Sequence, residues 1–192
     1  MPELTCQLKI TIQEIRPPIW RRVRVPGRMS LEALHRVIQI VFGWTNSHLH
    51  EFDIGGEDFG NAEEFPRPGD PGEHRVSIAG AVGMEIKRFL YTYDFGDDWR
   101  HEVVVEKVEP AGPGEDRAVC LGGKRHGPPE DCGGSWGYVE FLEAIHDPRH
   151  EQHGEMLEWI GGGFNPEAFD LAAVNKRLAT VKAPRSKRTR LQ

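Results

Sequence analysis

The stretch "IKRFLYTYDFGDDWRHEVVVEKVE", residues 86–109, is the strongest indication of the fold. Aromatic and β-branched residues dominate both of its halves, as they do in β-strands. Gly96, Asp97 and Asp98 separate the two halves, and these residue types tolerate the left-handed backbone angles of a tight reversal. The stretch therefore predicts a β-hairpin that reverses at residues 96–98.

The same stretch contains Asp94-Phe95-Gly96, a tripeptide that binds magnesium in protein kinases. A kinase would also need a glycine-rich loop over the phosphates, a strand lysine and a His-Arg-Asp catalytic loop on a longer chain. None of these is present in the sequence. We therefore interpret the tripeptide as part of the hairpin turn.

Three further segments upstream have strand periodicity, and one has helix periodicity. Residues 5–12 and 19–25 alternate between apolar and polar side chains, and "HLHEFDI" (residues 48–54) places two histidines on one face with two apolar residues. Residues 31–42 instead repeat their apolar side chains at helical spacing. Ser30 is a suitable N-cap for this helix, and Gly43 is a suitable stop.

The hairpin lies between two predicted loops, and helices follow the second of them. Residues 55–75 and 110–135 are rich in glycine, proline and acids, which predicts two long surface loops. After them, apolar residues at helical spacing predict a helix (Trp136, Val139, Leu142 and Ile145). A short helical piece follows around residues 156–160, and Asn165-Pro166 predicts the start of a third helix with Phe169 and Leu178 facing inward.

This order of elements predicts an α+β fold. We expect an antiparallel or mixed β-sheet with helices packed on one side and a helical C-terminal half. Residues 1–181 are expected to form a single domain, and residues 182–192 a basic, disordered tail.

Composition places the chain among soluble globular proteins. Its 192 residues are 38% hydrophobic and 28% charged, and no apolar run is long enough to span a membrane. The N-terminus lacks the layout of a signal peptide, so we expect a cytoplasmic protein without a membrane partner. Three cysteines are too few and too far apart to indicate a disulfide framework or a Cys-x-x-Cys zinc site.

The net charge of −6 is unevenly distributed. Residues 182–192 carry five basic residues and no acid, so subtracting +5 from −6 leaves −11 on residues 1–181. An acidic body of this kind repels phosphate backbones, whereas the tail would attract them. The tail is thus either a simple soluble terminus or an electrostatic arm for an acidic partner.

One candidate site is a divalent transition metal held by histidines. His48 and His50 are two residues apart, a spacing at which strand side chains project side by side and can chelate an ion. His101 on the outgoing hairpin strand, or Asp94 or Asp97 at the turn, would complete the ligand set. The alternative is that these histidines line a polar sheet edge and form only local hydrogen bonds.

Carboxylates gather at two turns. Asp94, Asp97 and Asp98 could bind a cation, although the hairpin reversal alone also demands such residues. Glu130 and Asp131 lie in "GPPEDCGGSWGY", with Ser135 as a candidate helix cap, and they are candidates for a catalytic acid and base. The alternative for this second loop is a purely structural role.

A third candidate is a basic surface on the strand of residues 19–25. Trp20, Arg22 and Arg24 share a face, with Arg21 and Arg28 nearby, and such a mixture can grip single-stranded nucleic acid by phosphate contacts and stacking. Trp99 beside the hairpin turn is a second aromatic that such a surface could use, or it belongs to the core. The alternative for the arginines is pairing with the many acids of this chain.

Five segments together resemble the plasmid pRiA4b ORF-3-like family, some members of which are described as passenger (TnpR-type) proteins of insertion elements. The segments span residues 19–178 in the order of the family: "IWRRVRVP", "LHRVIQIVFGWTNSHLHEF", "YTYDFGDDWRHEVVVE", "GPPEDCGGSWGY" and "FDLAAVNKRL". The resemblance implies a mixed α+β domain and names no reaction. Members often carry a cysteine where this chain has Gly127, which argues against a cysteine-based metal site here. The nucleophilic serine and helix-turn-helix of a serine recombinase are not recognisable.

Two hypotheses follow. The first is a binding module for nucleic acid or a nucleoprotein, associated with mobile elements, whose surface combines the histidine pair, the hairpin turn, the Glu130-Asp131 loop and the basic residues. The second is a metal-dependent hydrolase or nuclease with His48, His50, His101 and Asp97 as ligands. Both require the loop of residues 110–135 to fold over the hairpin turn, so that its carboxylates meet the imidazoles.

Overall fold

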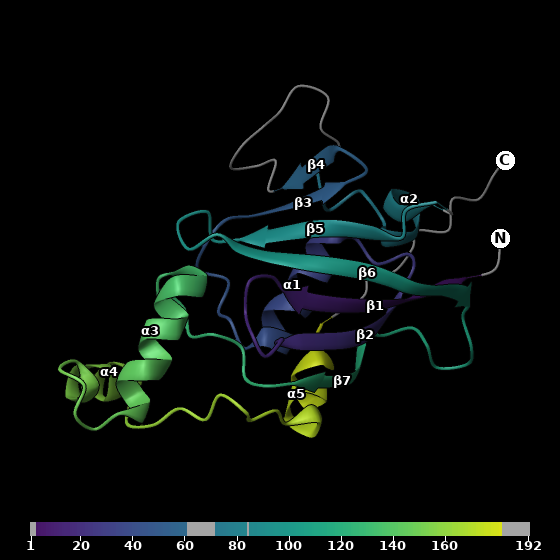
Figure 1. Cartoon of the computed structure of the whole chain (residues 1–192). Coiled ribbons are helices and arrows are strands. Elements are labelled where there is room, and N and C mark those ends of the chain that lie inside the picture. Colours follow the sequence, from purple (N-terminus) through teal and green to yellow (C-terminus); the bar gives the residue numbers. More distant parts are fainter. Residues whose placement is uncertain (1–2, 61–71, 84, 182–192) are drawn as a thin grey trace, which may run out of the picture.

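A seven-stranded antiparallel sheet forms the body of the protein (Figure 1). The computed structural model describes residues 3–60, 72–83 and 85–181. The strand order is β4-β3-β5-β6-β1-β2-β7, and every neighbouring pair is antiparallel. The strands are β1 (Leu4–Ile12), β2 (Trp20–Pro26), β3 (His50–Ile54), β4 (Glu57–Gly60), β5 (Arg88–Tyr93), β6 (Trp99–Pro110) and β7 (Val119–Lys124).

The predicted hairpin is β5–β6, which occupies the middle of the sheet. Tyr93 pairs with Trp99, so the reversal takes residues 94–98 and begins two residues earlier than predicted. Asp94 and Asp98 both have positive φ, at 57° and 51°. The Asp94 carboxylate accepts hydrogen bonds from the backbone N–H groups of Gly96 (2.9 Å) and Asp97 (3.3 Å), which fixes the turn from inside.

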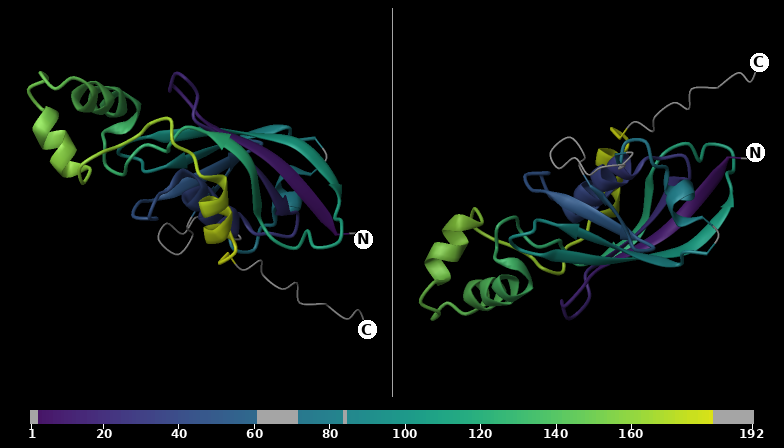
Figure 2. Two further views of the ribbon diagram at one scale, coloured as in Figure 1. Left: turned by 90° about the horizontal axis from the view of Figure 1, so that it is seen from below. Right: turned by 90° about the horizontal axis from the view of Figure 1, so that it is seen from above.

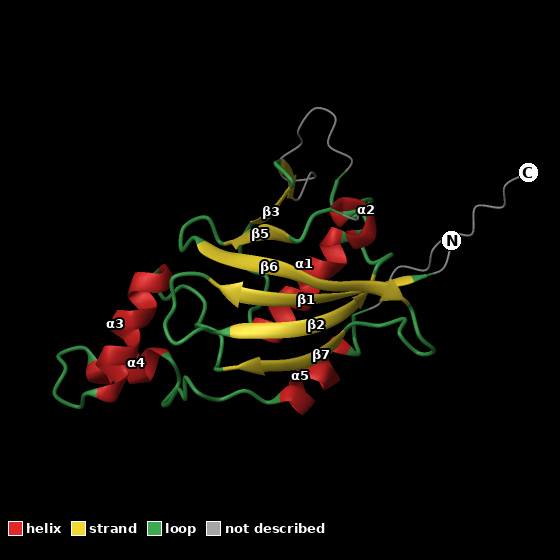
Figure 3. Ribbon diagram, turned by 45° about the vertical axis from the view of Figure 1, so that its right-hand side comes forward, coloured by secondary structure: helices red, strands yellow, loops and turns green. Residues whose placement is uncertain are grey.

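Helix α1 (Leu31–Phe42) covers one face of the sheet and lies behind the strands in Figure 3. Its predicted caps are confirmed: the Ser30 hydroxyl accepts from Ala33 N at 3.2 Å, and Gly43 has a φ of 92°. The helix buries nine side chains against the inward faces of the strands. The alternation predicted for β1, β2 and β3 is likewise confirmed, because Leu8, Ile10, Val23, Val25, Phe52 and Ile54 all lie in the core.

Two predicted loops contain strands that sequence reasoning missed. Strand β4 lies within residues 55–75 and β7 within residues 110–135, and each forms an edge of the sheet. Edge strands can be short and polar because only one side of the ladder is paired. On β7, the Asn175 side chain bonds both Cys120 N (2.8 Å) and Cys120 O (2.9 Å), taking the place of a further strand.

The helices after the sheet are α3 (Gly134–His146), α4 (His153–Trp159) and α5 (Leu171–Leu178); the short α2 (Ile78–Val82) precedes β5. Helix α5 packs beside α1, whereas α3 and α4 extend past one end of the sheet (Figure 2). The helical C-terminal half is not confirmed, because all of β6 and all of β7 belong to that half. No helix in the described ranges is long and apolar enough to cross a bilayer.

Of the apolar residues that predicted helix α3, Leu142 and Ile145 are partly buried against the core. Trp136 and Val139 are 82% and 47% exposed, whereas Tyr138, Phe141 and Ala144 are buried. The helix carries two apolar stripes, and the buried one is selected by what packs on it: Phe141 contacts the rings of Trp159 (5.5 Å between centroids) and Phe164 (5.4 Å). Periodicity alone cannot choose between two apolar stripes.

Two predicted helix starts are also wrong. Gly133 rather than Ser135 occupies the N-cap of α3, with a φ of 87°, and the Ser135 hydroxyl instead donates to Glu14 at 3.2 Å. Asp170 caps α5, accepting from Ala173 N at 2.9 Å, and Asn165 closes a separate turn before it. In both cases a turn residue stands a few positions from the true helix start.

Candidate functional site

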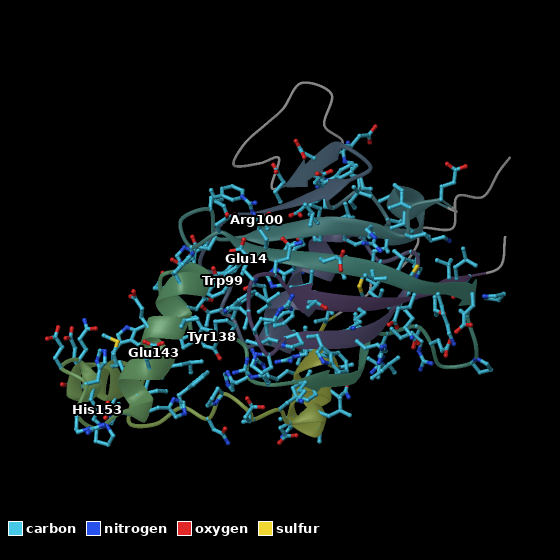
Figure 4. The ribbon with its side chains drawn as sticks, in the orientation of Figure 1. Glu14, Trp99, Arg100, Tyr138, Glu143 and His153 are labelled. Carbon is cyan, nitrogen blue, oxygen red and sulfur yellow. The ribbon has the colours of Figure 1, made fainter. Side chains whose placement is uncertain are left out.

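Three segments that are distant in sequence meet at one end of the sheet. These are residues 44–49 after α1, the β5–β6 turn, and residues 128–133 before α3. Trp44 Nε1 donates to Pro128 O at 2.9 Å, and Gly133 N donates to the Asp97 carboxylate at 3.1 Å. In Figure 4, Trp99 and Arg100 on β6 lie beside the start of α3, far from Glu143 and His153 at the outlying end. The loop before α3 thus folds over the hairpin turn, as both hypotheses required.

Glu130 is the most firmly held carboxylate in this region. Its Oε1 accepts from Thr45 N (2.7 Å), Thr45 Oγ1 (3.0 Å) and the Tyr93 hydroxyl (3.1 Å). Burial, and secondly the nearby Glu130 carboxylate, raise the pKa of Tyr93, so the hydroxyl keeps its proton and remains a donor. Glu130 therefore has a fixed orientation relative to the neighbouring histidine.

That histidine is His48, which three carboxylates surround. Its Nε2 lies 2.9 Å from Asp131 Oδ1, 3.6 Å from Asp94 Oδ2 and 3.9 Å from Glu130 Oε2. The Asp131 contact is short enough for a hydrogen bond but its geometry is not that of one, and the buried Nε2 atom has no hydrogen-bond partner among the described residues. Ligand atoms of His48, Asp94 and Asp131 all lie within 4.8 Å of one another. We call these three residues the His48 cluster.

His50 lines the same pocket as His48 but has different partners. Its Nε2 lies 2.8 Å from Glu73 Oε2, and its ring stacks on that of His35 with centroids 3.5 Å apart. His35 in turn bonds the Tyr91 hydroxyl (2.8 Å) and the Asn46 side chain. Burial, followed by the neighbouring His50, lowers the pKa of His35 to about 3, so this imidazole is neutral near pH 7.

His101 does not face the pocket. It is fully buried, packs edge-on against Trp44 (5.3 Å between centroids), and donates from Nδ1 to Trp99 O at 2.9 Å. Its Nε2 has no hydrogen-bond partner in the part of the chain that the structure describes, and burial lowers its pKa to about 4. The structure therefore separates His101 from His48, and sequence reasoning had no means of telling a core histidine from a ligand.

The burial of His101 predicts a pH dependence of stability. An unfolded histidine gains a proton below about pH 6.5, whereas folded His101 resists protonation down to about pH 4. The protein therefore loses stability as the pH is lowered through that window. Replacing His101 with phenylalanine should remove roughly 2 kcal/mol of this fall between about pH 7.5 and about pH 4.5. Urea unfolding at the two pH values measures it, with His74→Gln, an exposed histidine, as the control. An equal fall in wild type and His101→Phe would contradict the assignment.

The remaining turn residues have structural partners. Asp97 accepts a hydrogen bond from Gly133 N just before α3, Asp98 pairs with Arg100 at 2.9 Å, and Trp99 is 2% exposed. Four residues at this turn were proposed as part of a binding surface: Asp94, Asp97, Asp98 and Trp99. Of these four, Asp94 alone lines the pocket. Asp97, proposed as a metal ligand, faces the start of α3 instead.

Carboxylates neutralise the basic surface of β2. Arg22 pairs with Glu106 (2.7 Å), Arg24 with Glu115 (2.8 Å) and Arg28 with Glu3 (2.8 Å). The hydrogen bond from Arg22 is the main cause that lowers the pKa of Glu106 to about 2. Trp20 lies under Lys9 and Arg22, whose cationic groups are 5.6 and 5.3 Å from its ring centroid. The basic tail, residues 182–192, lies outside the described residues.

The pocket beside the His48 cluster has a volume of about 670 Å³. Its walls include Glu32, His35, Arg36, Asn46, Glu73 and Phe95, of which sequence reasoning named none as a site residue. His35 was detectable in principle, because it occupies a core-facing position of α1 next to Leu34. Glu73 was not, because it lies in a segment without periodicity.

The comparisons with known proteins agree with this architecture. The family model described as "Plasmid pRiA4b ORF-3-like protein" matches residues 5–173. The uncharacterised protein y4hQ of Sinorhizobium fredii (strain NBRC 101917 / NGR234) is 41% identical over 186 residues, which are 96% of this chain and 95% of that protein. The crystal structure of MM3350 from Methanosarcina mazei Go1, a protein of unknown function, superposes with a TM-score of 0.80 at 38% identity, covering 90% of this chain and 98% of that one.

Proposed function

The chain belongs to the plasmid pRiA4b ORF-3-like family, and from that premise we propose that it is a binding module built around a divalent-metal site at His48, Asp94 and Asp131. The relatives carry the fold without a named reaction, so the proposal rests on the geometry of the His48 cluster. We further propose that residues 1–181 act as one domain, with the basic tail as an accessory. A cytoplasmic location fits the three free cysteines.

The observation that carries the proposal is the spacing of the candidate ligand atoms. Two ligands about 2.1 Å from an ion at a tetrahedral angle lie about 3.4 Å apart. The His48 Nε2 atom is 2.9 Å from one Asp131 oxygen and 3.6 Å from one Asp94 oxygen, which bracket that value. Because no described residue forms a hydrogen bond with Nε2, this atom is also free to coordinate.

The donor set indicates which metals fit. One imidazole nitrogen suits zinc and other late transition metals, whereas carboxylate oxygens also suit manganese. Three protein ligands leave at least one coordination position open, as in catalytic rather than structural zinc sites. We therefore expect Zn²⁺ or Mn²⁺, with Glu130 as either a fourth ligand or the group that orients a bound water.

This arrangement also supports metal-dependent hydrolysis, and it does so more strongly than the arginines of β2 support nucleic-acid binding. A metal ion in such a site lowers the pKa of its bound water. Glu130 has a fixed orientation, and its Oε2 is 3.9 Å from His48 Nε2, so it is placed to accept a proton close to the metal. Arg22 and Arg24 of β2, in contrast, would each have to exchange a largely buried carboxylate partner for a phosphate, because the Glu106 and Glu115 side chains are only 22% and 20% exposed.

The test is direct metal binding. Metal-stripped protein, titrated with Zn²⁺ and with Mn²⁺ by calorimetry, should bind one equivalent of at least one of them. Asp94→Asn and His48→Gln should each weaken this binding by about 100-fold or more, because each removes one of three ligands. Asn at position 94 retains Oδ1, which makes the hydrogen bonds of the turn, and so removes mainly the coordinating charge.

Asp98→Asn is the matched control. Asp98 lies on the same turn with a similar positive φ, but its carboxylate pairs with Arg100 and not with His48. Its substitution should leave metal affinity unchanged. Absence of binding in the wild type, or equal loss in the Asp94 and Asp98 variants, would refute the site.

A further inference from the structure

The pocket beside the His48 cluster extends well beyond a metal ion. It lies between α1, residues 46–50 and the β5–β6 turn, and its volume of about 670 Å³ is in the range of small-molecule sites. We infer that it binds a nucleotide, with the phosphate between the metal and Arg36 and the base against Phe95. This inference rests on the proposed metal site.

The phosphate position follows from two positive groups at the pocket. A metal with three protein ligands has open positions that phosphate oxygens can fill. Arg36 lines the same pocket and pairs with Glu32 one helical turn away, and both side chains are exposed, at 58% and 37%. Exposed pairs of this kind contribute little, so Arg36 can exchange Glu32 for a phosphate, which it binds bidentately.

The base position follows from Phe95, which also lines the pocket. Its side chain is 52% exposed, and no ring contact among the described residues involves it. The backbone that carries Phe95 is nevertheless held in place, because Asp94 O accepts from Asp98 N at 2.6 Å and the Asp94 carboxylate accepts from Gly96 N. An exposed aromatic ring carried on a held backbone at the rim of a pocket is a platform on which a base can stack.

The acids of the pocket make nucleotide binding depend on the metal. Glu32, Glu73 and Asp94 line the pocket, and Asp131 and Glu130 adjoin it at His48. Glu73 is engaged by His50, yet the pocket without a cation is acidic and repels a phosphate. A nucleotide should therefore bind more tightly when the metal neutralises the cluster.

The experiment measures metal binding first and nucleotide binding second. Adenosine 5′-monophosphate is titrated into protein saturated with Mn²⁺ or Zn²⁺, and into metal-stripped protein. We expect binding in the loaded protein and at least tenfold weaker binding in the stripped one. A short 5′-phosphorylated DNA strand forms the second arm, and tighter binding of the strand would identify the nucleotide as a strand end rather than a free one.

Two substitutions separate the parts of the ligand. Phe95→Ala should weaken adenosine monophosphate binding about tenfold and leave ribose 5-phosphate binding unchanged. Arg36→Ala should weaken both ligands, and neither substitution should alter metal affinity. The matched controls are Trp136→Ala, an exposed aromatic outside the pocket, and Arg100→Ala, an arginine of β6 that does not line the pocket.

The outcomes distinguish this inference from the metal proposal. Metal binding without metal-dependent nucleotide binding would overturn the inference and leave the metal site standing. Failure of metal binding would overturn both. Equal effects of Phe95→Ala on adenosine monophosphate and on ribose 5-phosphate would also overturn the stacking assignment, because ribose phosphate has no base.

Discussion

Replacing Arg21 with alanine should lower the free energy of unfolding by about 4 kcal/mol, close to the whole stability of many domains. Arg21 is 2% exposed on the inner side of β2, and no carboxylate of the described residues forms an ion pair with it. Its guanidinium instead donates to the backbone carbonyls of Val41, Trp20, Lys124 and Arg125, at 2.6 to 2.9 Å. Alanine would leave these buried acceptors without a donor and create a cavity.

The position of Arg21 explains why it tolerates burial. Its guanidinium lies between the rings of Phe42 and Phe169, with centroids 5.0 and 4.4 Å away, so cation–π contacts add to the hydrogen bonds. Burial lowers the pKa of Arg21 to about 10, which still leaves the group charged at neutral pH. The four carbonyls belong to the end of α1, to β2, to the last residue of β7 and to Arg125 after it, so a single side chain joins three elements.

Chemical denaturation of Arg21→Ala and Arg22→Ala provides the measurement and its control. Arg22 is the next residue, on the outer face, and its partly exposed pair with Glu106 should contribute about 1 kcal/mol. Arg21→Lys should be intermediate, because an ammonium keeps the charge but cannot reach four carbonyls with three donors. Equal destabilisation by the two alanine variants would contradict the account.

Arg21 also shows where sequence reasoning stopped short. Alternation along β2 already places it on the face of Ile19 and Val23, yet its charge suggested the exposed cluster of Arg22 and Arg24. A strand period is a stronger constraint than a side chain's usual preference, because a single residue cannot leave its face without changing the register. The alternation of β2 therefore predicted the inward position of Arg21 correctly, whereas its charged side chain suggested an exposed one.

The elements that were predicted correctly are those whose signals are local. The β5–β6 hairpin, β1, β2, β3 and α1 each bury a regular stripe, and α1 has both caps in its sequence. The edge strands β4 and β7 were missed because they bury few side chains and are defined by pairing with a distant segment. The inward face of α3 was missed because the deciding contacts come from α4 and Phe164.

The candidate site likewise has a part that could be predicted from the sequence and a part that could not. His48, Asp94 and Asp131 could each be named from composition and spacing, because imidazoles and turn carboxylates are recognisable singly. Their meeting depends on tertiary contacts, such as that of Trp44 with Pro128, which no sequence window contains. His50 and His101 carry the same side chain as His48 but face Glu73 and the core, and only packing distinguishes the three.

Replacing Gly137 with alanine should destabilise the protein by about 2–3 kcal/mol, against the usual rule for helices. In a helix interior this substitution normally stabilises by up to about 1 kcal/mol. At Gly137, however, a Cβ atom would lie 2.0 Å from the backbone oxygen of Cys132 and 2.9 Å from its carbonyl carbon. Backbone atoms cannot rotate away, so residues 131–133 would have to move off the first turn of α3.

That displacement connects stability to the site, because Asp131 directly precedes Cys132. We expect Gly137→Ala to weaken metal binding at least tenfold in calorimetry, since a ligand would shift relative to His48. Gly154→Ala in α4 is the control: Gly154 is exposed, and a Cβ atom added there would meet none of the described atoms within 4 Å. This variant should gain a few tenths of a kcal/mol without affecting the metal. If Gly137→Ala also gained stability, the loop before α3 would not lie against the helix, and Asp131 would lose a backbone constraint that holds it beside His48.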